Sequence, residues 1–158
     1  MPLIVEDGTG RENAESYVAL AFADDYHERF DNAGWADADE PAREAALRRA
    51  TQYLDTRYTF GGEPLTDTQA LAWPRTLAPW PVRAVQAATC ELAIRALAGQ
   101  LYTDAGDAPV VQETVGPISV TYGSSQNGGQ PRFVVVEDML RGLFASVGRM
   151  TLRLERAS

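Results

Sequence analysis

The sequence contains no lysine, one cysteine and one histidine, and each shortage limits the chemistry available to the chain. Because Cys90 has no second cysteine to pair with, an internal disulfide and a multi-cysteine metal site are both excluded. No stretch approaches the roughly 20 apolar residues that span a bilayer, and the acidic Glu6-Asp7 near the start is unlike a secretory signal. The sequence therefore predicts a soluble protein that stays where it is made, in the cytoplasm.

Acidic residues outnumber basic residues by 22 to 14, which gives a net charge of −8. Proteins that bind nucleic acids by neutralising phosphates usually present basic faces. The composition therefore predicts weak non-specific DNA binding, although a local arginine patch is compatible with it. Four carboxylates gather in the first predicted helix: Asp24, Asp25, Glu28 and Asp31.

Length and apolar content indicate one domain, 1–158, with a core that needs no disulfide or metal. The expected fold is mainly α (α+β): a small bundle of about four helices with a β-hairpin or long loop and short terminal strands. Along the chain we expect an N-terminal arm at 1–18, a helical body at 20–104, a hairpin and loop at 110–132, and a C-terminal helix and strand at 133–158.

Apolar residues at helical spacing place the helices. The clearest pattern covers 40–58, where Asp39 can cap the first turn and Pro41 occupies a position whose missing N–H costs nothing. Ala33-Gly34 is expected to end the first helix. The other expected helices are 20–31, 66–73, 82–102 and 134–147.

Alternating apolar and polar residues predict a hairpin or two short strands at 110–122, a flexible loop at 123–131 and a terminal strand at 149–154. Between the helices, 73–81 is a proline-bounded connector whose tryptophan rings are expected to pack onto the core. The same region offers the best candidate for base stacking, for which packing is the alternative explanation: Trp73, Arg75, Trp80 and Arg83.

No catalytic constellation is visible. His27 lies among carboxylates on a predicted helix, so we expect a partly solvated imidazole that holds its proton and is a poor base. Cys90, among alanines, is predicted to be a buried structural thiol. Carboxylate pairs such as Asp37/Asp39 lack the pattern of a calcium loop. The sequence predicts no enzyme, no metal site and no cofactor.

Seven short motifs follow one another along the chain: LIVEDGTG from Leu3, AESYV from Ala14, ADDYH from Ala23, RATQYLD from Arg49, QALAWPR from Gln69, ATCELA from Ala88 and VGPISV from Val115. Their order and spacing resemble, over nearly the whole chain, a family from tailed phages and prophages labelled DnaT-like single-stranded DNA-binding proteins. The chain is also similar to head–tail connector (adaptor) proteins of long-tailed phages, which are helical subunits with a hairpin or long loop, arranged as a ring beneath the portal.

The two resemblances imply different functions. An adaptor would be a structural protein of the virion neck, made in the bacterial cytoplasm, whose ring lets double-stranded DNA pass without specific binding. Its partners would be the portal protein, a tail-side connector or stopper protein and copies of itself in a dodecamer, with no membrane involved. Because an acidic wall repels phosphates, the composition favours this function. The alternative is a single-stranded DNA-binding protein of phage replication.

The adaptor hypothesis assigns roles to three groups of residues. The tail would dock on a partner, or alternatively pair with the hairpin of its own subunit, through Arg149, Leu152, Arg153, Leu154 and Arg156. The hairpin and loop would form a second interface through Val115, Ile118, Val120, Tyr122, Gln126 and Asn127. The carboxylates that would face the passing DNA are Asp24, Asp25, Glu28 and Asp31.

Overall fold

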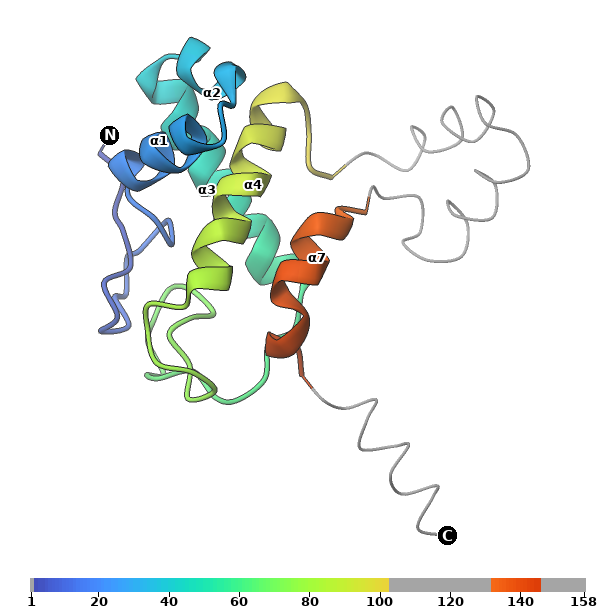
Figure 1. Cartoon of the computed structure of the whole chain (residues 1–158). Coiled ribbons are helices and arrows are strands. Elements are labelled where there is room, and N and C mark those ends of the chain that lie inside the picture. Colours follow the sequence, from blue (N-terminus) through green and yellow to red (C-terminus); the bar gives the residue numbers. More distant parts are fainter. Residues whose placement is uncertain (1, 103–131, 146–158) are drawn as a thin grey trace, which may run out of the picture.

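The structure, a computed structural model, describes residues 2–102 and 132–145, and in these ranges it is mainly helical, as predicted (Figure 1). The expected hairpin, loop and terminal strand lie outside the described residues. No helix within them is both long and apolar enough to span a bilayer. The elements are α1 (Leu20–Arg29), α2 (Ala33–Asp37), α3 (Glu40–Arg57), α4 (Arg83–Ala98), α7 (Val134–Leu140) and the 3-10 turn η1 (Arg141–Leu143).

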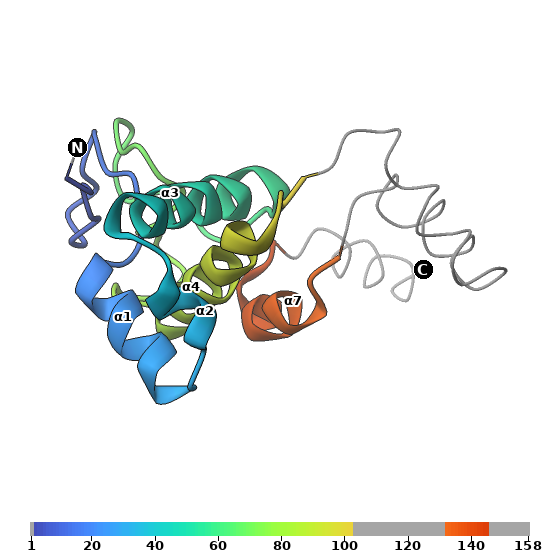
Figure 2. The same cartoon turned by 90° about the horizontal axis from the view of Figure 1, so that it is seen from above.

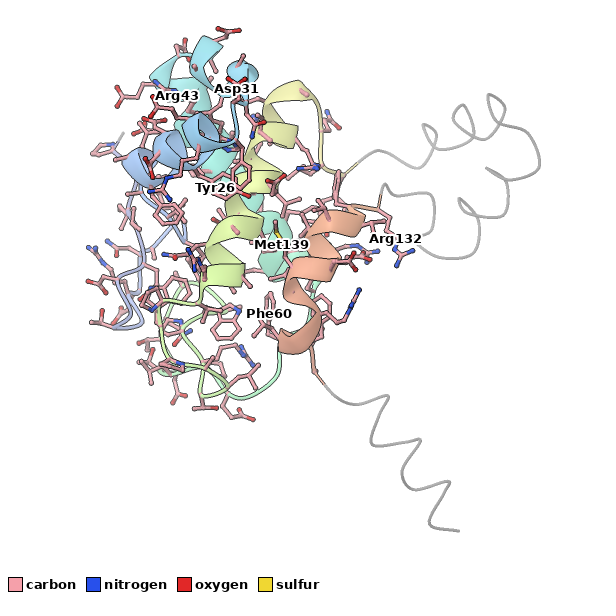
Figure 3. All side chains as sticks on the ribbon, in the orientation of Figure 1. Tyr26, Asp31, Arg43, Phe60, Arg132 and Met139 are labelled. Atoms are coloured by element: carbon pink, nitrogen blue, oxygen red, sulfur yellow. The ribbon has the colours of Figure 1, made fainter. Side chains whose placement is uncertain are left out.

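The centre of the fold is the contact between α3 and α4. The two helices run in opposite directions, with α1 and α2 packed at one end of the pair and α7 against α4 (Figures 1 and 2). Figure 3 shows Met139 on the side of α7 that faces α4. The core between these helices is built from fully buried side chains, among them Leu47, Leu54, Val85, Leu92 and Leu140.

The start of α3 follows directly from its sequence. The Asp39 carboxylate accepts a hydrogen bond from the backbone N–H of Ala42 at 2.9 Å, and Pro41 occupies the first turn. Both predictions are confirmed, and the helix ends at Arg57, one residue before the expected end. Its buried face is the predicted apolar stripe: Ala46, Leu47, Ala50, Tyr53 and Leu54.

Small side chains let α4 pack closely against its neighbours. Ala88, Ala93 and Cys90 have no exposed surface, which confirms a buried thiol, and burial raises the pKa of Cys90 to about 12. The helix ends at Ala98 rather than at residue 102. Leu101 remains buried after the helix has ended, so the apolar pattern continues further than the helical backbone does.

Three sequence expectations about helices are wrong. Residues 66–73 form a loop without helix, because the Gln69 side chain bonds the backbone of Thr66, Leu71 and Pro74 and fixes a turn. Ala33-Gly34 begins the short α2 instead of only ending α1, and this turn carries Trp35 into the core. The last helix gives way to the turn η1 at Arg141, well before residue 147.

The N-terminal arm is extended, as expected, and is organised by one carboxylate. The Glu6 side chain is buried and accepts backbone N–H groups from Gly8 at 2.7 Å, Gly10 at 2.9 Å and Arg11 at 3.0 Å. Gly10 has φ +80°, and a Cβ there would lie 2.9 Å from Thr66, so both the backbone and the space favour glycine.

Asp55 joins the arm, α3 and the Trp-Pro connector. Its carboxylate accepts the Tyr17 hydroxyl at 2.6 Å and the Ala72 N–H at 3.1 Å, while the Tyr17 oxygen accepts the Trp73 N–H at 3.1 Å. Burial disfavours the charged form and raises the pKa of Asp55 to about 6. Three segments that are distant in sequence therefore depend on one carboxyl group.

This raised pKa predicts that the free energy of unfolding falls as pH rises. The folded protein binds the Asp55 proton more tightly than the unfolded chain, so stability from this group is full below pH 3.8 and decreases up to about pH 6. The decrease is up to about 3 kcal/mol, from roughly two pKa units. Asp55→Asn should remove this pH dependence of the free energy of unfolding. The substitution should also change the free energy of unfolding by an amount that is the same at every pH.

Urea unfolding of both proteins between pH 4 and 7 measures the effect. His27 acts in the opposite direction because burial lowers its pKa, so its contribution rises with pH, and only the difference between the two proteins isolates Asp55. A difference that does not change with pH would contradict the role assigned to Asp55.

Candidate functional site

An open groove of about 800 Å³ lies where the second half of α3 meets the segment that follows α4. Figure 2 shows this segment, drawn in yellow, reaching the C-terminal end of α3. The groove is walled by apolar residues of α4 and its continuation, Ala96, Leu97 and Leu101. Its polar lining consists of Arg49, Gln52, Thr56, Gln100 and Tyr102.

One face of α3 supplies four of the eleven lining residues. Arg49, Gln52, Tyr53 and Thr56 are spaced i, i+3, i+4 and i+7, which places them in one row on the helix surface. The row spans about 10 Å from Arg49 to Thr56. Tyr53 is buried at the floor, whereas Arg49 and Gln52 are exposed.

Tyr102 is held at the mouth of the groove with part of its ring free. The side chain is 42% exposed, its ring lies 4.9 Å from that of Tyr53, and its hydroxyl is 3.3 Å from the Thr56 hydroxyl. Phe133 packs on Tyr53 in a T-shaped arrangement, with 5.5 Å between the ring centroids. Tyr102 therefore has a fixed backing and an accessible face.

The backing of Tyr102 extends into the core through a series of aromatic contacts. Tyr53 meets Tyr58 at 6.0 Å, Tyr58 stacks on Phe144 at 5.3 Å, and Phe144 lies 6.2 Å from Phe60. Figure 3 shows Phe60 at the end of the molecule where the connector between α3 and α4 lies. Because these rings are packed on one another, the groove wall is stiffer than an isolated surface tyrosine would be.

The charge of the groove differs from that of the whole chain. No Asp or Glu is among the lining residues that the structure describes. Arg49 is exposed and forms no ion pair within residues 2–102 and 132–145, whereas Arg29, Arg43, Arg95 and Arg141 each pair with a carboxylate there. A chain of net charge −8 thus keeps a locally cationic groove.

This arrangement has defined chemical abilities. An exposed tyrosine ring can stack a flat apolar ring, and a free guanidinium can bind a phosphate or carboxylate. The amides of Gln52 and Gln100 can donate and accept hydrogen bonds. The groove is therefore suited to a ligand that combines flat rings with anionic groups.

The stacking site expected from the sequence is not assembled. Trp73 is fully buried, and Arg75 is occupied by backbone carbonyls: Nε donates to Gly61 at 2.8 Å, Nη2 to Gly62 at 2.8 Å and Nη1 to Ala72 at 3.1 Å. For these two residues the packing explanation is confirmed.

The other two members of that site also lie apart from the groove. Trp80 is half-buried, with its ring 5.5 Å from Tyr17 and in contact with Gly8 of the arm. Arg83 is exposed at the start of α4, whereas the groove is at the end of that helix. Trp80 thus packs against the arm, and neither Trp80 nor Arg83 lines the groove.

The expectation for His27 is wrong. The side chain is 1% exposed, with Nε2 3.0 Å from the Cys90 carbonyl and Nδ1 2.9 Å from the Asn32 amide. Because a carbonyl only accepts, Nε2 carries the proton and Nδ1 accepts from Asn32. Burial lowers the pKa of His27, so the imidazole is neutral. Charge attraction from Asp24 and Glu91 favours the protonated form, but the effect of burial is larger.

The acidic cluster is not one continuous anionic face. The Asp24 carboxylate accepts the Trp35 indole N–H and an Arg43 N–H, both at 2.7 Å, and Asp25 pairs with Arg29 at 2.8 Å. Figure 3 shows Asp31 and Arg43 at the same end of the molecule. Glu28 and Asp31 are exposed. Asp24 therefore joins α1 to α2 and α3, whereas the Asp25–Arg29 pair lies within α1.

The remaining sites predicted from sequence lie outside the described residues: the tail residues Arg149, Leu152, Arg153, Leu154 and Arg156, and the hairpin and loop residues Val115, Ile118, Val120, Tyr122, Gln126 and Asn127. Within the described part of the chain, no three His, Cys, Asp or Glu side chains come together in a way that could hold a metal ion.

The fold is a small helical domain with an open, partly aromatic groove. A sequence model of the family described as "Putative DnaT-like ssDNA binding protein" matches residues 1–157, and the chain belongs to this family. No curated protein and no solved structure matches the chain.

This match corrects the function favoured by composition. The chain was expected to be a head–tail adaptor, a portal-binding ring subunit of the virion neck, but the family to which it belongs is described by single-stranded DNA binding. The physical reason for the error is that net charge averages over the surface. Ion pairs use arginines and carboxylates in equal number and leave that excess unchanged, but the residues described as lining the groove include an arginine and no carboxylate.

Arg75 provides a test of its structural role. Arg75→Gln removes hydrogen bonds to three carbonyls, so we expect the free energy of unfolding to fall by about 1–3 kcal/mol with no change in DNA affinity. Arg83→Gln is the matched control, with an expected change within about 0.5 kcal/mol. Loss of DNA binding by a folded Arg75→Gln protein would instead indicate that Arg75 contacts DNA.

Proposed function

We propose that the protein binds single-stranded DNA in the groove between α3 and the end of α4. The observation that carries the proposal is an exposed Tyr102 ring, packed on Tyr53, in a groove that also contains Arg49. Among the described residues Arg49 forms no ion pair, and no carboxylate lines the groove. Family membership supports the same function. We expect no catalytic activity.

In this proposal an unpaired base stacks on the free face of Tyr102. Stacking on aromatic side chains is the common way in which proteins hold single strands, and it is open only to bases that are not paired. Because Tyr53 and the Thr56 hydroxyl already contact Tyr102, little side-chain entropy is lost when a base arrives.

Arg49 supplies the contact to the DNA backbone. It lies two helical turns from Thr56, the residue that touches Tyr102, so the arginine and the stacking ring are about 10 Å apart along α3. This separation suits one or two nucleotides, with a base at one end of the groove and a phosphate at the other.

The stacking ring gives the first functional prediction. Tyr102→Ala should weaken binding of a short single-stranded oligonucleotide by about 1–3 kcal/mol, while Tyr102→Phe keeps most of the affinity. Fluorescence anisotropy of labelled oligo-dT measures both. Phe30→Ala is the matched control, because Phe30 is a 62% exposed aromatic residue on α1, away from the groove. Equal loss in the Phe30 and Tyr102 variants would argue against a specific groove.

The arginine gives a second prediction, on salt dependence. If Arg49 is the principal phosphate contact, log K should fall with log salt with a slope of about −0.7, the value for one phosphate on a single strand. Arg49→Gln should bring the slope close to zero, and Arg83→Gln should leave it unchanged. A slope several times steeper in the parent protein would show that more arginines contact the DNA than this groove provides.

A further inference from the structure

We infer that the groove also reads the edge of the stacked base and prefers adenine to thymine, through Gln52, Gln100 and the carbonyl end of α4. The inference rests on the proposed single-stranded DNA binding and adds a base preference to it. The relevant geometry is the meeting of two exposed amides and a helix C-terminus in one groove.

Both amides are available. Gln52 and Gln100 are exposed, and neither side chain is hydrogen-bonded within the described residues. Gln69 shows the contrast, since its amide makes three hydrogen bonds inside its own loop. A free glutamine amide matches adenine, donating to N7 and accepting from the N6 amino group in a bidentate pair.

The end of α4 adds acceptors beside these amides. The last carbonyls of a helix lack intrahelical partners. At the end of α4 the Gly99 N–H donates to the carbonyl of Arg95 at 3.1 Å. No other backbone N–H of the described residues donates to Leu97 or Ala98, both of which line the groove. An amino group of adenine can donate its second hydrogen there, whereas the thymine oxygens would face further acceptors.

Stacking favours the same base. A purine offers a larger face to Tyr102 than a pyrimidine does, so the ring contact and the edge contacts select adenine together. Guanine is a competitor, because an arginine pairs with its O6 and N7. If Arg49 contacts the phosphate, as its spacing along α3 favours, it cannot pair with guanine at the same time.

The test uses an eight-nucleotide oligo-dT with one central position changed to adenine, cytosine or guanine, which avoids self-stacking of an oligo-dA. We expect the single adenine to tighten binding about 5- to 10-fold over oligo-dT. In a Gln52→Leu/Gln100→Leu variant the adenine-to-thymine ratio should fall to about one. Gln86→Leu, at a glutamine of α4 outside the groove lining, should preserve the ratio.

The outcomes separate the two proposals. Equal binding of the adenine and thymine oligonucleotides, with binding still dependent on Tyr102, overturns the base preference and leaves the proposed function standing. A guanine preference that Arg49→Gln removes also overturns it and moves Arg49 from the phosphate to the base. Absence of Tyr102-dependent binding for every oligonucleotide would remove the proposed function itself.

Discussion

The close contact between α3 and α4 is the constraint on which the rest of the structure depends. α3 and α4 make the most extensive contact between helices in the described chain, and both contribute residues to the groove. α7 packs on α4, and its preceding residue Phe133 contacts the ring of Tyr53. Ala88 and Ala93 of α4 have no exposed surface, so a bulkier residue at either position would overpack the core around α4.

Core and surface are continuous in this protein. The aromatic series from Tyr102 through Tyr53, Tyr58 and Phe144 joins the exposed ring to the buried interior. Such a ring is already positioned before a ligand arrives, which favours binding by reducing the entropy lost. The Asp55 hydrogen bonds serve a different purpose, because they hold the arm and the connector on the far side of α3 and keep Arg75 among carbonyls.

Charge in this chain has to be considered locally. An excess of eight carboxylates gives a field that disfavours DNA, but salt screens exposed charges beyond about 10 Å, so net charge does not describe an individual groove. The composition therefore pointed away from the function by which the family is described. Several of the same carboxylates turn out to hold helices together, as Asp24 does between Trp35 and Arg43.

By itself the sequence determined the class of fold, the helix α3 with its Asp39 cap and buried stripe, the buried thiol of Cys90 and the packing of Trp73, because periodicity and capping are local properties. The spacing of Arg49, Gln52 and Thr56 along α3, which places them in one row of the groove, is also a local property of the sequence. Only the tertiary structure decided that Tyr102 returns to this row of residues, that His27 is buried and neutral, and that Arg75 is occupied by carbonyls. These outcomes depend on contacts that have no periodic signal in one sequence: Tyr102 with Thr56 and His27 with Cys90 are separated by 46 and 63 positions, and the Arg75 contacts lie in an irregular loop.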